Sequence, residues 1–505
     1  MTSRTPESKA TRREWIGLAV IALPCLLYSM DLMVLNLAIP ALSADLEPTA
    51  AQLLWIIDIY GFLLAGMLIP MGTLGDRIGR RRLLLIGAGA FGIASALAAF
   101  SPNAEMLIAM RAVMGVAGAT LAPSTLSLIR NMFHDPHERT VAIGIWVSSY
   151  SVGAAIGPLL GGALLEHFWW GSVFLINVPV MLLLLGIAPL LLPEYRDSAA
   201  GQIDLPSAGL SLAAVLASIY GLKRVAEQGV SWPALLSIIA GFMIGWAFLR
   251  RQRMLAKPMI DLSLFRLPGF AAALAMYALG TFVAFGMFLF VAQHLQLVLG
   301  MNPLQAGLWT TPFAAAFIVG SMVTPKLARR YPPTRIMTAG LFISAAGFAM
   351  LSQVSVTTSP VVLATAFVVY ALGLAPVFTL STDLIVGSAP PEQGGAAAAI
   401  SETGSELGGA LGIAMLGSVG AAVYRIAMND AAPQGLPEES IRSAASTLGA
   451  AVEAARQLGE PWASALLDAS RGAFVEALRA SAIGAALVMA ASAILALRSL
   501  RPARA

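Results

Sequence analysis

Charge is scarce in this chain. Only 11% of its 505 residues are Asp, Glu, Lys or Arg, whereas 58% are hydrophobic. A soluble globular protein carries roughly 25% charged residues, because its whole surface meets water. Most of the surface of this chain must therefore contact something other than water. The composition argues against a soluble enzyme, a nucleic-acid-binding protein and a disordered scaffold, and it favours a polytopic membrane protein.

Cysteine and histidine are also scarce. The single cysteine, Cys25, excludes an internal disulfide framework and a thiolate metal cluster. The four histidines are far apart except for His134 and His137, which stand in a charged loop. We therefore expect no metal site and no cofactor. The net charge of +4 does not indicate nucleic acid as a partner, because basic loops set the topology of membrane proteins.

Long apolar segments, by contrast, are abundant. A hydrocarbon core of ~30 Å requires about 20 residues of helix. Fourteen segments are long enough: 15–42, 51–71, 83–100, 104–129, 140–165, 170–192, 205–225, 231–249, 269–299, 305–325, 336–353, 359–387, 394–424 and 474–497. We predict an all-α integral membrane protein with fourteen transmembrane helices. The first segment is not a cleaved signal peptide, because it is too long and contains Asp31.

Basic residues are distributed unevenly between the connecting segments. With the N-terminus in the cytoplasm, 23 of the 31 Lys and Arg residues fall in cytoplasmic segments and 7 in external ones. The external set includes Lys223 and Arg224, and Arg111 alone stands within a span. Since cytoplasmic loops are enriched in Lys and Arg, we predict a bacterial cytoplasmic membrane protein with both termini in the cytoplasm.

Two connections are longer than the others. Residues 250–268 are basic and amphipathic, and we expect them to lie along the inner membrane face. Residues 425–473 form an extracytoplasmic loop with Leu448, Val452, Ala455 and Leu458 at helical spacing. An insertion of that length is either a functional cap or a tolerated excursion, and the sequence leaves both open.

Ionisable side chains within the spans need a partner, water or a purpose, because each costs at least ~2.5–3.5 kcal/mol at mid-bilayer. Five stand out: Asp31, Asp58, Arg111, Glu402 and Glu406. A rise of 1.5 Å per residue places the first three in one layer of the outer half, where Arg111 can pair with a carboxylate. The two glutamates, four residues apart, share a helix face. Asp383 lies close enough to the inner interface to be solvated.

One arginine leaves about three of the four acids without a basic partner. Burial away from a counter-charge favours the protonated form of a carboxyl group, so these acids can exchange protons with water. A cationic substrate would be attracted to the same place. Structural ion pairs that face the bundle interior are the alternative interpretation. We favour a functional role for Asp31 and at least one glutamate, while the two interpretations of Asp58 are balanced.

Three motifs resemble those of the major facilitator superfamily. GTLGDRIGRRR (72–82) resembles the signature between spans 2 and 3, and MRAVMGVAGA (110–119), with Arg111, resembles the span-4 motif. GAAIGPLLGG (153–162) resembles a span-5 signature associated with antiporters. The cytoplasmic gate would comprise Gly72, Gly75, Asp76, Arg77, Gly79, Arg80 and Arg81. The antiporter motif comprises Gly153, Gly157, Pro158, Gly161 and Gly162, whose small residues let helices approach and whose proline introduces a kink.

Within that superfamily, three further segments resemble those of the fourteen-span drug:proton antiporters that export quaternary ammonium compounds. MDLMVLNLAIP (30–40), LLWIIDIYGFLLAG (53–66) and ISETGSELGGALGIA (400–414) carry this similarity. It implies proton-driven export of lipophilic cations such as quaternary ammonium biocides, dyes and viologens. It also implies that Asp31, Asp58, Glu402 and Glu406 take part in proton coupling and cation recognition, and that Arg111 acts as a charge relay.

The resemblance also implies an architecture. Two six-helix bundles would occupy 15–192 and 269–498, with two extra spans and an amphipathic linker in 193–268 and cytoplasmic tails at 1–14 and 499–505. Two departures matter. The span at 305–325 lacks the acid that some members carry, and PKLARRYPP (325–333) has basic residues but no acid. An inner latch should therefore rest mostly on Asp76 and its neighbours.

A flat cation also needs apolar contacts. Asp31 and Glu406 lie nearest the midplane and are the predicted contacts of a proton or substrate. Aromatic side chains that could cover the cation, with plain packing as the alternative, are Tyr28, Tyr60, Trp146, Tyr150, Trp309 and Phe378. We expect a monomer. An exporter of another small amphipathic compound and a proton-coupled uptake symporter of the same fold remain open.

Overall fold

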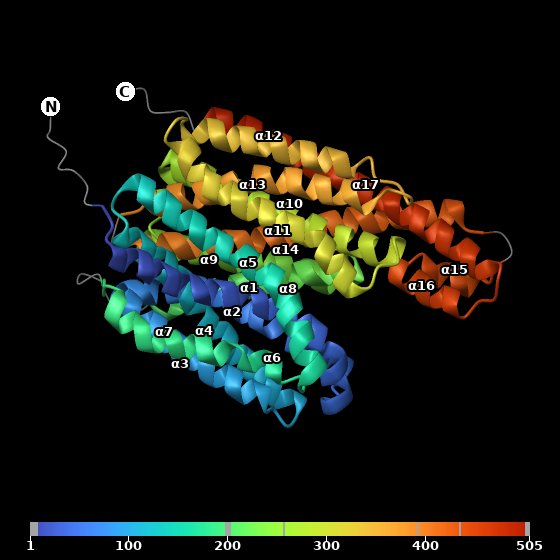
Figure 1. Ribbon diagram of the computed structural model, residues 1–505, viewed down its shortest axis with the longest axis horizontal. Helices are drawn as coiled ribbons and strands as arrows, with labels where there is room; N and C mark the ends of the chain where they lie inside the picture. The colour runs from blue at the N-terminus through green and yellow to red at the C-terminus, as the bar shows by residue number, and fades with distance from the viewer. Residues whose placement is uncertain (1–8, 197–203, 256–257, 391–392, 434–435, 500–505) are drawn as a thin grey trace.

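The computed structural model describes residues 9–196, 204–255, 258–390, 393–433 and 436–499, and nearly all of them lie in helices (Figure 1). Fourteen helical segments are long and apolar enough to cross a membrane, which confirms the predicted all-α membrane architecture. The elements are α1 (Arg12–Leu46), α2 (Ala50–Ile78), α3 (Arg80–Ala99), α4 (Ala104–Met132), α5 (Pro136–His167), α6 (Ser172–Leu175), α7 (Asn177–Leu191), α8 (Leu205–Gln228), α9 (Trp232–Met254), η1 (Leu262–Arg266), α10 (Pro268–Gln293), η2 (His294–Val298), α11 (Pro303–Ala328), α12 (Pro333–Leu351), α13 (Pro360–Ser388), α14 (Gly394–Ala431), α15 (Glu438–Ala444), α16 (Leu448–Arg456) and α17 (Trp462–Ser499).

Polar capping residues define where several helices begin. At the start of α2 the Thr49 side chain accepts a hydrogen bond from the backbone of Gln52, whose side chain accepts one from the Thr49 backbone. Asn302 and Gln305 form the same reciprocal pair at the start of α11. Such caps satisfy backbone N–H groups that the helix itself leaves unpaired. Because hydrocarbon offers no hydrogen-bond partners, the remaining backbone groups are satisfied only within the helices.

Some predicted boundaries differ from the structure. The span predicted at 170–192 is divided at Ile176 into α6 and α7. Residues 250–254, predicted as part of the linker, form the last turn of α9, where basic side chains are favourable near the helix C-terminus. Residues 256–257 of that linker and the predicted tail at 500–505 lie outside the described residues.

The predicted loop at 425–473 is shorter than expected. Helix α14 continues to Ala431 and α17 begins at Trp462, with α15 and α16 between them. In α16 the buried side chains are Leu448, Ala451 and Ala455. Leu448 and Ala455 belong to the predicted apolar face, whereas Leu458 lies beyond the end of the helix.

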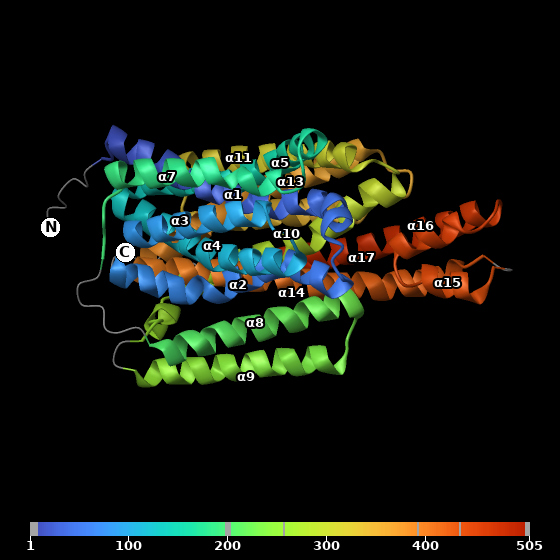
Figure 2. The same cartoon turned by 90° about the horizontal axis from the view of Figure 1, so that it is seen from below.

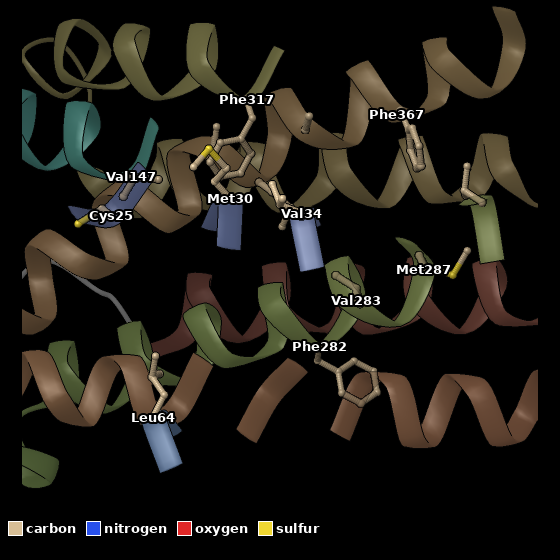
Figure 3. Close-up of a cluster of buried hydrophobic side chains, with 14 of the residues drawn as sticks. Cys25, Met30, Val34, Leu64, Val147, Phe282, Val283, Met287, Phe317 and Phe367 are labelled. Atoms are coloured by element: carbon tan, nitrogen blue, oxygen red, sulfur yellow. The ribbon is translucent and has the colours of Figure 1, made fainter. Parts of the chain in front are cut away.

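The helices pack in two groups. In the first, α1 packs against α5, and α2 and α3 pack against α4. In the second, α10 packs against α14, while α12 packs against α13 and α17. The two groups meet where α5 lies against α11 and α2 against α14 (Figure 1). Figure 3 shows buried side chains from both groups, among them Met30 and Val34 of α1 and Phe317 of α11.

Helices α8 and α9 lie side by side along one edge of the molecule, and α8 packs against α2 and α14 (Figure 2). Arg251 of α9 donates to both carboxylate oxygens of Asp204, which precedes α8, at 2.9 and 3.0 Å. The Arg251 guanidinium and the Ser207 hydroxyl lower the pKa of Asp204 to about 2. Asp204 is therefore ionised throughout the physiological pH range, and the pair joins α8 to α9.

Helix α1 begins and α17 ends at the same end of the bundle, at the left in Figures 1 and 2, which we call the terminal end. Helices α14 and α17 each contain 38 residues. At 1.5 Å per residue such a helix is about 57 Å long, well beyond a ~30 Å hydrocarbon core. Their surplus length projects at the opposite end, where they carry α15 and α16 (Figure 2). There the Tyr424 hydroxyl donates a 2.9 Å hydrogen bond to the Ala444 carbonyl.

Helices α12 and α13 approach closely at two glycines. A Cβ atom on Gly340 would lie 2.5 Å from the Gly373 carbonyl oxygen. A Cβ atom on Gly373 would likewise overlap the Gly340 carbonyl and Ser344. The two backbones can therefore pack at this distance only with glycine at both positions.

We predict that Gly373→Val destabilises the protein, because overpacking a tight contact costs about 1–3 kcal/mol. Thermal unfolding of the purified protein in detergent should shift to lower temperature. The control is Gly89→Val on α3, where a Cβ atom would meet nothing within 4 Å. Equal unfolding temperatures for the two variants would contradict the packing described here.

Candidate functional site

Two glutamates on α14 and a tyrosine on α1 form the centre of the candidate site. Glu402 and Glu406 lie about one turn apart and share a face of α14. The Tyr28 hydroxyl donates a 2.7 Å hydrogen bond to Glu406 Oε1. Because α1 belongs to the first group and α14 to the second, this hydrogen bond crosses the interface between the two groups.

Glu402 has a different aromatic neighbour. The Tyr277 hydroxyl of α10 donates to Glu402 Oε1 at 3.5 Å, and the Tyr277 ring packs edge to face on Phe378 at 5.0 Å between ring centroids. Phe378 in turn packs on Phe317 at 5.6 Å. This side of the site is therefore built by α10, α11 and α13 of the second group.

A second aromatic cluster lies on the first-group side. The Tyr28 ring lies 6.3 Å from that of Tyr60 and 5.7 Å from that of Tyr150, and Trp146 packs on Tyr150 at 5.0 Å. The hydroxyl groups of Tyr60 and Tyr150 are buried and have no hydrogen-bond partner among the described residues. Four of the six predicted aromatic residues thus form one cluster around Tyr28, which is the member that contacts Glu406. Phe378 lies on the opposite side, and Trp309 packs on the main hydrophobic core without a ring contact to either cluster in the described structure.

Asp31 and Arg111 form a closed ion pair within the first group. Arg111 Nη1 lies 2.5 Å from Asp31 Oδ2, and the two side chains are 0% and 4% exposed. Arg111 Nε also donates to the Ile56 carbonyl at 3.2 Å, and its guanidinium lies 4.5 Å from the centroid of the Tyr60 ring. Asn177 Nδ2 donates to the second Asp31 oxygen at 3.4 Å. Asp31 therefore presents no unpaired charge in this conformation, and its role in coupling stays a prediction.

Asp58 has a basic partner that the sequence count placed outside the membrane. Lys223 of α8 forms an ion pair with Asp58 of α2. The prediction assigned Lys223 to an external segment, but α8 continues to Gln228, so the lysine lies within the helix. Of the four acids, therefore, two rather than three lack a salt bridge to Lys or Arg in the described structure, namely Glu402 and Glu406.

The motif at 72–82 joins the two groups at the terminal end. Asp76 pairs with Arg80 across the turn between α2 and α3, and its carboxylate also interacts with the first backbone N–H groups of α14, at Gly395 and Ala396. A carboxylate at a helix N-terminus is stabilised by the partial positive charge there. A Cβ atom on Gly72 would lie 2.7 Å from the Gly395 carbonyl oxygen, so α2 and α14 are in close contact.

The other residues of that motif shape the turn and fix the start of α3. Gly79 has a φ of 112°, a left-handed conformation that favours glycine, and a Cβ atom on Gly75 would crowd the Arg80 guanidinium. Arg81 Nη1 donates to the carbonyl oxygen of Leu192 at 3.0 Å, and Arg77 interacts electrostatically with Asp204. The first of these contacts holds the α2–α3 turn against the end of α7, and the second links it to the start of α8.

A second connection at the terminal end was not predicted. Arg139 Nε of α5 donates to Asp383 Oδ1 of α13 at 2.7 Å, and the Thr140 hydroxyl donates to Oδ2 at 2.7 Å. The expectation that Asp383 is only solvated is therefore wrong, because α5 and α13 pack together and bring a basic side chain to it. The connection between the two groups at the terminal end therefore rests on the Arg139–Asp383 pair as well as on Asp76.

The glycines of the predicted antiporter motif lie in α5, where it packs against α1. A Cβ atom on Gly153 would overlap the Leu26 carbonyl, and one on Gly161 would lie 2.8 Å from Val34. Gly157 is buried, whereas a Cβ atom on Gly162 would meet nothing within 4 Å. The side chain of Pro158 lies outside the described part of the structure.

Three site residues were missed by reasoning from the sequence: Lys223, Arg139 and Tyr277. Lys223 stands inside the apolar segment 205–225, so its position in a span could have identified it. Arg139 directly precedes a predicted span and gave no signal of its own. Tyr277 resembles any other aromatic residue in a span, and only the packing of α10 on α14 brings it to Glu402.

Comparison with known proteins supports the fold and the family. A family model described as the Major Facilitator Superfamily matches residues 21–413. The multidrug efflux pump LfrA of Mycolicibacterium smegmatis is 44% identical over 494 residues, covering 98% of this chain and 97% of that protein. The methyl viologen resistance protein SmvA of Salmonella typhimurium is 37% identical over 466 residues, covering 92% and 93%.

Solved structures show the same fold at low sequence identity. The human organic anion transporter MFSD10 superposes with a TM-score of 0.60 at 15% identity, covering 98% of this chain and all of that one. A bacterial homologue of the human lysosomal transporter Spinster gives 0.56 at 17% identity, covering 97% of this chain and 99% of that one. The predicted resemblance is confirmed: the chain belongs to the major facilitator superfamily and is a membrane transporter rather than an enzyme.

Proposed function

We propose that this protein exports lipophilic cations across the membrane in exchange for protons. Its family and its relatives support drug efflux, since the similar proteins include a multidrug efflux pump and a methyl viologen resistance protein. Methyl viologen is a flat organic cation. The observation that carries the proposal is the pair Glu402 and Glu406, which hydrogen bond to tyrosines and lie between two aromatic clusters.

A proton and a substrate cation compete for Glu406, and this competition couples proton entry to export of the cation. A protonated Glu406 is neutral and tolerates the apolar surroundings, whereas an ionised Glu406 needs a cation. A lipophilic cation meets that need with its charge, while the rings of Tyr28 and Tyr150 cover its apolar body. When a proton from the external side binds the carboxylate, the cation loses its counter-charge and leaves. Release of the proton to the cytoplasm completes the cycle.

We place the terminal end of the bundle in the cytoplasm, in agreement with the distribution of basic residues. In this conformation the two groups are connected at that end by Asp76 with the start of α14 and by Arg139 with Asp383. We infer that these contacts close the cytoplasmic side in this conformation. Alternating access then requires both connections to break.

Two alternatives share this fold. Export of another small amphipathic compound, such as the one handled by the tetracenomycin C resistance and export protein of Streptomyces glaucescens, 31% identical over 484 residues, would not require two free carboxylates. Uptake by symport would use the same acids but move substrate inward with the proton. The direction of transport under an imposed pH gradient separates uptake from the proposal. Comparing a cationic with a neutral drug separates the other exporter.

We predict that Glu406→Gln abolishes most proton-driven efflux of ethidium from proteoliposomes with an imposed pH gradient. Losing a charged contact costs about 1.5–3 kcal/mol, which corresponds to a roughly ten- to hundredfold loss of cation affinity. A neutral drug should be affected less. Tyr28→Phe removes only the hydrogen bond to Glu406 and should cause a smaller loss.

The matched control is Glu453→Gln on α16, an exposed glutamate paired with Arg456 at 3.2 Å. It should pump at the wild-type rate. The proposal is wrong if Glu406→Gln also pumps ethidium at the wild-type rate, or if wild-type protein does not respond to the pH gradient.

We also predict that Arg139→Gln opens the terminal end. Losing this ion pair, worth roughly 0.2–1 kcal/mol, should increase the open population by up to about fivefold. Cys25 reports the change because it is the single cysteine, is buried in this conformation, and interacts electrostatically with Glu402 of the second group. Its maleimide labelling should accelerate. The control is Arg330→Gln, on an exposed side chain two residues after the end of α11. Equal labelling rates in the two variants would contradict a closing role for the Arg139–Asp383 pair.

A further inference from the structure

Helix α8 belongs to the pair that lies outside the two helical groups, yet it contacts both of them. Ile219 of α8 packs with Phe62 of α2 and with Leu407 of α14 in one apolar cluster. Leu407 directly follows Glu406 in the sequence, and Phe62 lies one turn from Asp58. The cluster therefore fixes α8 beside the two helices that carry these acids.

Lys223 lies one turn beyond Ile219, and its side chain reaches Asp58 of α2. Its ammonium group pairs with Asp58 and lies 5.0 Å from the centroid of the Phe62 ring. It also interacts electrostatically with Glu406. The Asp58 side chain is 14% exposed and that of Lys223 is 38% exposed, so the carboxylate is largely buried while the lysine keeps partial access to the surface.

The other charged groups on the helices around Lys223 either have partners of their own or lie at the terminal end. Arg111 of α4 is occupied by Asp31, and Glu105 at the outer start of α4 accepts a 2.6 Å hydrogen bond from Gln52. Asp76 of α2 pairs with Arg80 at the terminal end. From α1, the Tyr28 hydroxyl is the group that faces Glu406.

The charges on α8, α9 and α14 complete this environment. Arg224 turns to the Tyr220 hydroxyl at 2.6 Å. The arginines of α9 lie in its last turns at the terminal end, where Arg251 pairs with Asp204. Glu402 lies one turn from Glu406 toward the same end and is bonded to Tyr277. Among the described residues, Lys223 forms an ion pair with Asp58 and also interacts electrostatically with Glu406.

We propose that Lys223 is a positioning residue of the coupling site, acting as a counter-ion that Asp58 and Glu406 share. The inference rests on the proposed function. While Glu406 carries a proton, the ammonium group of Lys223 pairs with the Asp58 carboxylate. When Glu406 releases its proton to water, the same ammonium stabilises the carboxylate until a substrate cation replaces it. The added helix α8 thereby takes part in the transport cycle.

The test measures equilibrium binding of ethidium to the purified full-length protein as a function of pH, by fluorescence polarisation. Removing a nearby opposite charge from a carboxylate favours its protonated form. In Lys223→Met the pH of half-maximal binding should therefore move upward, by up to about one unit. Lys223→Arg keeps the charge and should restore most of the wild-type profile.

Arg224→Gln is the matched control, because it removes the neighbouring positive charge that faces Tyr220 and should leave the profile unchanged. If Lys223→Met instead has the wild-type profile while wild-type binding depends on pH, the inference is overturned. If wild-type binding does not depend on pH at all, the proposed proton coupling fails first.

Lys223→Met leaves Asp58 buried and unpaired, which is a risk to folding. The pair Asp58→Asn and Asp58→Asn/Lys223→Gln avoids that unpaired carboxylate. An upward shift of the pH profile in the double variant relative to the single variant supports sharing with Glu406. Identical profiles would show that Lys223 acts on Asp58 alone and would overturn the shared counter-ion.

Discussion

Every charge inside the bundle has to be compensated, because the membrane interior offers no water to solvate it. The structure meets this requirement in two ways. Asp31 and Asp58 are paired with basic side chains, Arg111 and Lys223. Glu402 and Glu406 receive hydrogen bonds from tyrosine hydroxyl groups instead. A hydroxyl group stabilises a carboxylate without neutralising it, so these two glutamates keep the capacity to take up a positive charge.

The position of each contact relative to the two helical groups determines what it can do. The Asp31–Arg111 pair lies inside the first group, so it can persist while the groups move against each other. The hydrogen bond from Tyr28 to Glu406 joins the groups and must break when they separate at this level. The Asp31–Arg111 pair thus stays within one group, whereas Glu406 lies at the boundary between the two groups.

The sequence predicted the fourteen spans, and its spacing argument placed Arg111 within reach of an acid. It also identified the two glutamates as partners on one face. It did not predict the Lys223–Asp58 pair or the Arg139–Asp383 pair. Each pair joins residues more than 160 positions apart, and their contact depends on how the helices pack. The division of the sixth span at Ile176 was likewise not predicted, because the segment as a whole is apolar enough to be taken as one span.

Helix α14 links three parts of the molecule in a single element. Its first backbone N–H groups meet Asp76 at the terminal end, and Glu402 and Glu406 lie in roughly its first third. Near its other end, the Tyr424 hydroxyl donates a hydrogen bond to the Ala444 carbonyl. No proline interrupts it, so the usual cause of a sharp kink is absent. A tilt of α14 that frees Asp76 would therefore swing α15 and α16 in the opposite direction, as the two arms of a lever move. The position of α15 and α16 would then report whether the contact between Asp76 and α14 at the terminal end is intact.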